Sequence, residues 1–394
     1  MESMIRLGID KMEIDWRKNN IDDSHSFLFQ QDDFKTVPYY YPYNEVKYKK
    51  GFLKNMNSIK RRLNLLGYTL KKIENMFDEE IEYFNQLYNI SLSINFTDYY
   101  DVLKSINIKE IDMTAAEYER DYDLGEYVRK CVIKEIPELK NLFNNDIYMI
   151  GEFLENLSPY ITLRILSENK NNLDLDLIWR TEDIVETGCL LEKDITSRLT
   201  PKEKILIVTE GSTDTNIIQK CIDLLYNDIS DFFDYIDMEK NYPFTGTGNL
   251  KNFIKGLSKI NIQNNILVIL DNDTAGYSVY NDIKQIILPQ NLKVITLPNH
   301  IEFNNFKCKG PQGESFENIN GKAVSIECFL DYTSVKEDIY VRWTGFDKTL
   351  IQYQGNIEPK DLLIKSFHKN FYNKYDFSKI KYLIDYILKM WLTQ

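Results

Sequence analysis

The chain has 394 residues, of which 43% are hydrophobic, and this length exceeds one usual hydrophobic core, so two or three domains are predicted. The net charge of -12 and the pI near 5.0 exclude a generally basic nucleic-acid binder, so any contact with DNA or RNA would need a local patch. The five cysteines are scattered without a C-x-x-C pair, which argues against a disulfide framework and a zinc knuckle. No apolar run is long enough to cross a membrane and no signal-peptide pattern opens the chain, so we expect a cytoplasmic protein without membrane contact.

Residues 1–198 are predicted to form an α-rich α+β domain. Apolar and polar residues alternate near the start, and the segments 27–29 and 37–43 also have strand character. From about Gly51 to residue 170 the apolar spacing becomes helical. Within this region, one helical face is expected to carry Tyr118, Tyr122, Val128 and Val132.

Residues 199–335 are predicted to form an α/β domain. The charged segment 199–204, which contains a proline, has the character of a linker and precedes the most apolar run of the chain, at 205–209. Further strands are expected at 232–237, 266–270 and 292–297, with helices at 213–226, 249–259 and 274–287 and a glycine turn at 246–248. Apolar strands joined by helices of this length predict a Rossmann-like, mainly parallel sheet with helices on both faces. Such sheets place their chemistry at the carboxyl ends of the strands.

The end of the chain is expected to be irregular and then helical. A passage rich in Gly and Asn follows Pro298, and a β-like run follows at 323–330. Residues 336–394 are predicted to be a C-terminal helical extension, with a final lysine-rich helical region at 359–393.

Acidic residues follow two of the predicted strands. Glu210 ends the first strand, with Asp214 four residues later, and Asp271 and Asp273 end the strand at 266–270. Carboxyl ends of parallel strands share one sheet edge, and clustered carboxylates repel one another unless a cation neutralises them. Carboxylate ligands suit Mg²⁺ or Mn²⁺, which would activate water for attack on a phosphodiester. Asp214 or Asp273 alone could simply cap the helix that follows it.

The pattern E-G-x-x-D, a middle G-x-G-N and D-x-D-x-x-G resembles the Toprim domain of topoisomerases, bacterial primases, recombination mediators and OLD-family nucleases. The resemblance covers about 100 residues and implies that Glu210 is a general acid/base or metal ligand. It implies that Asp271 and Asp273, with Asp214, hold Mg²⁺ or Mn²⁺. Gly211 and Gly248 would then let the backbone turn closely beside the site.

Comparison with OLD-type nucleases implies two further groups. Glu327, in the run at 323–330, is similar in placement to their additional acidic ligand, although a surface acid is an equal alternative. The same comparison makes a lysine useful for charge stabilisation; Lys360 is the best placed candidate, and Arg342 and Lys348 compete with it.

The first 200 residues resemble the HEPN/Toprim-associated N-terminal domain of bacterial defence proteins, through Asp15–Trp16, the H-S-x-L-F segment at 25–29 and the PYYY run at 38–41. In such proteins the domain precedes an HEPN ribonuclease or a Toprim module. An HEPN ribonuclease needs R-x₄₋₆-H, and no arginine has this spacing to any of the three histidines. The resemblance therefore assigns catalysis to the Toprim segment.

Other features have two interpretations. His25 with Asp22 and Asp23 could form a metal site, but a polar loop histidine is preferred. The tyrosine run at 39–43 could stack bases, but a packed β-like surface is preferred. The lysine-rich segment 365–382 could follow a phosphate backbone or be a solvated helix face.

The sequence thus predicts a Mg²⁺- or Mn²⁺-dependent nuclease for DNA or RNA, with tRNA among the candidate substrates, acting in anti-phage defence. A homo-oligomer and a separate defence partner protein are expected. The alternatives are a primase- or topoisomerase-like enzyme, and a non-enzymatic sensor or scaffold that binds nucleic acid.

Overall fold

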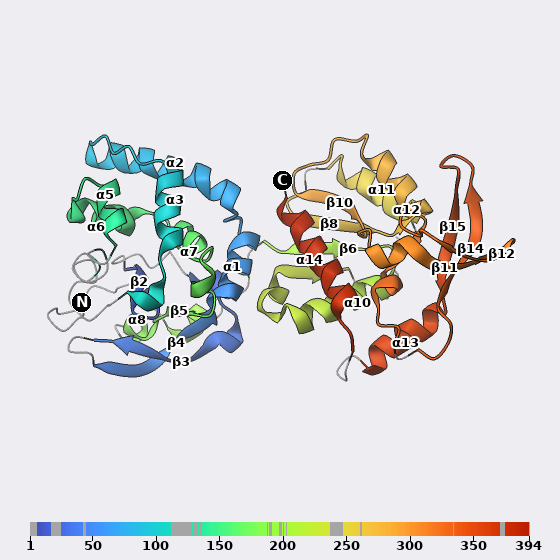
Figure 1. Cartoon of the computed structure of the whole chain (residues 1–394). Coiled ribbons are helices and arrows are strands. Elements are labelled where there is room, and N and C mark those ends of the chain that lie inside the picture. Colours follow the sequence, from blue (N-terminus) through green and yellow to red (C-terminus); the bar gives the residue numbers. More distant parts are fainter. Residues whose placement is uncertain are drawn as a thin grey trace. The chain divides into compact units, whose positions relative to one another are not determined.

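The computed structural model forms two compact units, Met1–Pro201 and Lys202–Gln394, each described by itself (Figure 1). The boundary falls inside the linker-like segment 199–204. The described residues are 6–16, 25–41, 45–111, 128, 133, 136–186, 188, 191–196, 199, 201, 203–236, 247–260, 262–333, 335–370 and 375–393. Within them no helix is long and apolar enough to cross a membrane.

The first unit contains a five-stranded antiparallel sheet in the order β2-β1-β5-β4-β3. Its strands are β1 (Leu7–Ile9), β2 (Met12–Asp15), β3 (Phe34–Tyr40), β4 (Val46–Asn55) and β5 (Asp176–Trp179). The central β5 comes from the far end of the unit and pairs with both β1 and β4. The sheet is therefore complete only when the whole unit has folded.

Helices fill the chain between β4 and β5 and follow β5. They are α1 (Met56–Leu65), α2 (Leu70–Tyr88), α3 (Phe96–Ser105), α5 (Pro137–Leu142), α6 (Ile147–Asn156), α7 (Pro159–Leu166), α8 (Glu182–Glu186) and α9 (Glu192–Thr196). Short 3-10 helices are η1 (His25–Leu28), η2 (Gln31–Asp33), η4 (Ile108–Glu110) and η7 (Lys170–Asn172). In α2 the residues spaced three or four apart, such as Ile73 and Phe77, are buried, as an amphipathic helix requires.

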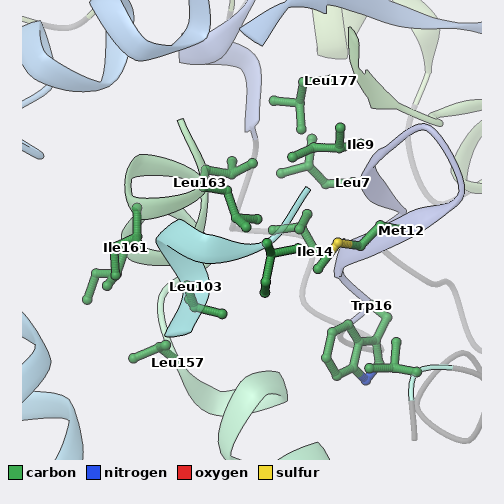
Figure 2. Close-up of a cluster of buried hydrophobic side chains, with 14 of the residues drawn as sticks. Leu7, Ile9, Met12, Ile14, Trp16, Leu103, Leu157, Ile161, Leu163 and Leu177 are labelled. Carbon is green, nitrogen blue, oxygen red and sulfur yellow. The ribbon is translucent and has the colours of Figure 1, made fainter. Parts of the chain in front are cut away.

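The core of the first unit lies between its sheet and its helices. Figure 2 shows Leu7, Ile9 and Ile14 of β1 and β2 gathered near Leu103 of α3 and Leu163 of α7. Every residue of β1 and β2 is buried, so both faces of these strands are covered. The predicted α-rich α+β character of the unit agrees with this arrangement.

Three predictions for the first unit were wrong. The segment 27–29 is mostly 3-10 helix rather than strand, and β4 continues to Asn55, past the point where helical spacing was expected. His25 is not a polar loop residue: it is 2% exposed, with Nε2 3.1 Å from Asp15 Oδ2 and Nδ1 3.2 Å from the Tyr160 hydroxyl. A sequence cannot show such a partner from a distant helix.

Two other predictions for this unit have different outcomes. The tyrosine run is packed in its described part, residues 39–41, since Tyr39 in β3 is buried and its hydroxyl donates to the Lys50 carbonyl. The helical face expected at 113–136 lies mainly outside the described residues, which include its Val128, a buried residue, but not Tyr118, Tyr122 or Val132.

The second unit is built on a parallel sheet in the order β10-β8-β6-β7. Its strands are β6 (Ile205–Val208), β7 (Phe233–Tyr235), β8 (Asn265–Leu270) and β10 (Leu292–Thr296). The helices α10 (Ser212–Leu225), α11 (Thr247–Leu257) and α12 (Thr274–Ile283) connect them, with η8 (Asn227–Phe232) before β7. The mixed α/β class with a parallel sheet is therefore confirmed.

Helices cover both faces of this sheet. Helices α11 and α12 pack side by side, and α10 packs against α14 (Ser378–Leu392) (Figure 1). Right-handed crossovers place α10 on one face and α11 with α12 on the other, because the chain reverses direction across the sheet after β7. The core under α11 and α12 includes Leu250, Ile254, Val268 and Val279.

The region after β10 differs from the prediction. The supposedly irregular and helical segments contain a second sheet, β12-β11-β14-β15, with β11 (Phe306–Gly310), β12 (Gly313–Glu317), β14 (Tyr340–Asp347) and β15 (Gln352–Glu358). The helical extension expected at 336–394 is thus wrong for its first part, whereas α13 (Lys360–Asn370) and α14 agree with the final helical region expected at 359–393. Strand β12 is almost wholly exposed, so it lacks the apolar face by which a strand is recognised.

Smaller elements complete the second unit. They are the two-stranded pairing of β9 (Asn272–Asp273) with β13 (Ala323–Val324), and the 3-10 helices η9 (Ile301–Asn305) and η10 (Ile326–Phe329). Helix α12 is about one turn shorter than predicted, and α11 begins at Thr247, inside the expected glycine turn.

Candidate active site

Glu210 connects three elements at the carboxyl edge of the parallel sheet. It follows β6, and its Oε1 accepts the backbone N–H of Asp271 at 3.0 Å. Its Oε2 accepts the Thr247 hydroxyl, at the start of α11, at 2.9 Å. Because β6 and β8 are parallel neighbours in register, with Val208 opposite Val268, their ends deliver Glu210 and Asp271 to the same place.

Asp273 has a structural role at the same edge. As the N-cap of α12, its Oδ1 accepts the Gly276 N–H at 2.7 Å, the capping interaction that an acid before a helix provides. Its Oδ2 accepts the Gln354 side-chain amide at 2.5 Å. Asp273 therefore caps the helix and also faces β15.

Gly276 is the glycine that the local backbone requires. A Cβ at this position would lie 2.2 Å from the Asp271 carbonyl oxygen, far inside contact distance. Among the described residues, a Cβ at Gly211 would meet only Asp214 Oδ2, at 3.6 Å, and one at Gly248 would meet nothing within 4 Å, so packing against these residues does not require either glycine. The close approach occurs after β8 rather than after β6.

Glu327 is fully buried, with 0% exposure. It lies on η10 rather than at the end of a strand, which corrects the predicted β-like run; only Ala323–Val324 of that run is strand. Its Oε2 accepts the Ser325 hydroxyl at 2.7 Å. Its Oε1 forms an ion pair with Lys360 Nζ at 3.0 Å, and among the described residues this buried oxygen has no further donor.

Lys360, the first residue of α13, supplies the positive charge beside these acids, and 48% of its side chain is exposed. Of its two competitors, Arg342 donates to the Tyr340 hydroxyl on its own strand. Lys348 lies in the turn between β14 and β15. The contacts of the described residues therefore favour Lys360.

Electrostatics join the acids into one group, the carboxylate cluster, made of Glu210, Asp214, Asp271, Asp273 and Glu327. Burial raises the pKa of Asp271 well above its usual value, and the other four carboxylates raise it further. Burial, followed by the charge of Glu327, raises the pKa of Asp214 to about 7. Burial also raises the pKa of Glu210, while hydrogen bonds from Asp271 and Thr247 oppose the rise. Because a charge shifts a neighbouring pKa strongly only at short range, these effects place the other four carboxylates near Asp271.

The cluster fits a hard divalent cation by its chemistry. All of its donors are carboxylate oxygens, which Mg²⁺ and Mn²⁺ prefer, and Glu327 Oε1 is a buried oxygen without a hydrogen bond. Among the described residues, however, no three His, Cys, Asp or Glu side chains stand as a preformed metal cage. Both oxygens of Glu210 and of Asp273 already accept hydrogen bonds, so a cation would be held partly through water, as Mg²⁺ usually is.

Three residues of the site were not found from the sequence. Thr247 and Ser325 donate hydroxyl hydrogen bonds to Glu210 and Glu327, and Gln354 donates to Asp273. Thr247 is the variable residue between the two glycines of the G-x-G-N pattern, so that pattern marked its position in the sequence. Gln354 belongs to a strand that the sequence did not indicate.

The second unit is thus an α/β domain with a carboxylate cluster at the carboxyl edge of its parallel sheet, preceded by an α+β unit. The model of the family HEPN/Toprim N-terminal domain 1 matches residues 1–203, just over half of the 394-residue chain, and the chain belongs to this family. No curated protein and no solved structure matches it.

Proposed function

We propose that this protein is a cytoplasmic Toprim-type nuclease of the OLD-like kind, which uses Mg²⁺ or Mn²⁺ to hydrolyse phosphodiester bonds of DNA or RNA in anti-phage defence. The observation that carries the proposal is the carboxylate cluster. Burial and the charges of the neighbouring acids, from the end of β6, from α10 and from η10, raise the pKa of Asp271 at the end of β8, and Lys360 lies beside them. Buried acids that repel one another are costly to a fold, and they concentrate at functional sites.

Two further observations support the Toprim assignment. The motif residues follow β6 and β8, which are adjacent and parallel, as the resemblance requires. The family of the N-terminal unit is named for HEPN and Toprim proteins, and the sequence lacks the R-x₄₋₆-H pattern of an HEPN ribonuclease. The Toprim alternative is therefore the better supported of the two.

The residues of the site would have different roles in hydrolysis. A bound divalent cation would supply Lewis-acid stabilisation and a water of lowered pKa, with Asp271, Asp273, Asp214 and Glu327 as its ligands. Glu210, whose pKa is raised by burial, is suited to accept the proton of the attacking water near neutral pH. Lys360, half exposed beside Glu327, is suited to stabilise negative charge on the phosphate oxygens.

The test is cleavage by the purified full chain. Plasmid DNA, single-stranded DNA and total tRNA are incubated with protein in Mg²⁺, Mn²⁺ or EDTA. We expect metal-dependent cleavage of at least one substrate, reduced by roughly 100-fold or more in Glu210→Gln and Asp271→Asn. A matched control is Asp282→Asn, which changes a carboxylate of α12 that pairs with Lys251 and should cleave normally. Binding without cleavage in every metal would overturn the proposal and favour a scaffold.

A further inference from the structure

A polar cavity lies along α10 and the edge strand β7 of the second unit. Its volume is about 470 Å³, within the range of small-ligand sites. It is lined by Ser212, Thr215, Asn216, Gln219, Asp223, Ser230, Phe233, Asp234, Tyr235 and Ile236. Neither the carboxylate cluster nor Lys360 is part of this lining.

The cavity starts beside the candidate active site. Ser212, Asn216, Gln219 and Asp223 are spaced by four, three and four residues and are all exposed, so they form one face of α10. At about 1.5 Å per residue this face runs for roughly 16 Å. Ser212 lies two residues after Glu210 and in the same helical turn as Asp214. A nucleic-acid strand with one phosphate at the carboxylate cluster would therefore place a neighbouring nucleotide at the mouth of the cavity.

The chemistry of the lining disfavours phosphate. Among the described lining residues there is no lysine, arginine or histidine, whereas Asp223 and Asp234 bring carboxylates. Asp234 forms an ion pair with Lys204 at 2.9 Å. Asp223 is therefore the carboxylate better able to accept a hydrogen bond from a ligand. The cavity thus suits a neutral group that donates hydrogen bonds, since a carboxylate accepts but does not donate.

The remaining walls suit a flat heterocycle. The Tyr235 hydroxyl is buried and has no hydrogen-bond partner among the described residues, which is costly unless a ligand or water satisfies it. Asn216 and Gln219 can donate and accept at once, as side chains that read the edge of adenine do. Phe233 and Ile236 add apolar surface.

We propose that this cavity is a base pocket, which takes an unpaired nucleobase with an exocyclic amino group next to the phosphodiester that is cut. Asp223 accepts from the amino group, as acidic side chains accept from the amino group of cytosine. A base inside a duplex has its pairing edge occupied, so it must be single-stranded or flipped out to enter. This inference rests on the proposed nuclease function, to which it adds a selection for unpaired adenine, cytosine or guanine.

Binding tests the pocket without cleavage. In a Glu210→Gln background, the full chain is titrated with fluorescent single strands that are identical except for one central A, C or T (or U), as DNA and as RNA. We expect binding of the A and C strands to exceed that of the T or U strand by about tenfold, the size of one or two hydrogen bonds. Asp223→Ala, which removes the acceptor, and the conservative Tyr235→Phe should reduce this ratio to about twofold or less, whereas Asp282→Asn should leave it unchanged.

The cut sites give a second measurement. Wild type should cut next to amino-bearing unpaired bases, and Asp223→Ala, which lacks the acceptor, should show little base preference at the sites that it cuts. Equal binding of all strands by the Glu210→Gln protein, or an unchanged preference in both pocket variants, would overturn the inference. A protein that binds with the expected preference but cuts nothing would overturn the nuclease proposal and leave the pocket supported.

Discussion

At the scale of residues, the fold holds the carboxylate cluster under electrostatic stress. Burial and like charges raise the pKa of Asp214 and Asp271, so the folded chain keeps protons that the unfolded chain would release. Lys360 offsets only part of this stress, because it pairs with Glu327 and stays half exposed. The stress should be measurable as a dependence of stability on pH.

We predict that Asp214→Asn becomes more stable than wild type as pH rises, when no metal is present. Below about pH 4, Asp214 is protonated in both the folded and the unfolded chain. Between pH 4 and the folded-state pKa of about 7, Asp214 ionises only in the unfolded wild type, which stabilises the unfolded state. The free energy of unfolding of the wild type therefore falls relative to that of the variant. Thermal unfolding in EDTA at pH 4 and pH 8 measures this. The variant's melting temperature should exceed that of wild type by about 4 °C or more at pH 8 only, and Mg²⁺ should remove the gain. An equal difference at both pH values would contradict the account.

Lys360→Gln should lower cleavage by about 100-fold, because it removes the cation aimed at the cluster. Lys365→Gln is a matched control, since Lys365 is an exposed residue of the same helix α13 and should retain cleavage within about twofold. Steady-state cleavage rates of the two variants on the preferred substrate measure this difference. Equal rates for both variants would show that Lys360 has no part in the chemistry.

At the scale of elements, the loop from β8 into α12 positions both Asp271 and Asp273. The loop closes tightly because Gly276 has no side chain where the Asp271 carbonyl lies. Asp273 is the N-cap of α12, and its side chain is held there because it accepts the Gly276 N–H. One glycine therefore controls two acids of the cluster.

Gly276→Ala should destabilise the protein by roughly 2 kcal/mol or more and abolish cleavage, because the backbone must move to avoid overlap. Gly256→Ala provides the contrast: this glycine lies within α11, and no atom of the described residues would lie within 4 Å of its Cβ, so alanine should stabilise by about 0.5–1 kcal/mol. Urea unfolding of both variants gives the comparison. Similar stability changes for the two would refute the tight approach at Gly276.

Sequence patterns could predict the elements that bury a continuous apolar run. Strands β6, β8 and β10 were located to within one or two residues, as was α10, because apolar runs and helical spacing are direct signals. Strands β11, β12, β14 and β15 were missed, since partly exposed strands bearing charges carry little of that signal. The same limit hid Gln354, while Glu327 was identified on the wrong element.

At the scale of the whole molecule, the chain combines a unit of the HEPN/Toprim N-terminal domain 1 family with an α/β unit that carries the carboxylate cluster. The order of these units agrees with the resemblance to defence proteins, in which an associated domain precedes the catalytic one. The family is known from residues 1–203, whereas the chemistry was inferred from residues beyond them. Evidence for the function must therefore come from the second unit.

The most direct measurement is sequencing of the ends of cellular DNA and RNA after expression of wild type or Glu210→Gln. We predict new ends in one class of nucleic acid with wild type, enriched next to unpaired bases, and none above background with the variant at equal protein level. The same new ends with both proteins, or with neither under conditions where a phage triggers defence, would contradict the central claim that the carboxylate cluster cuts nucleic acid.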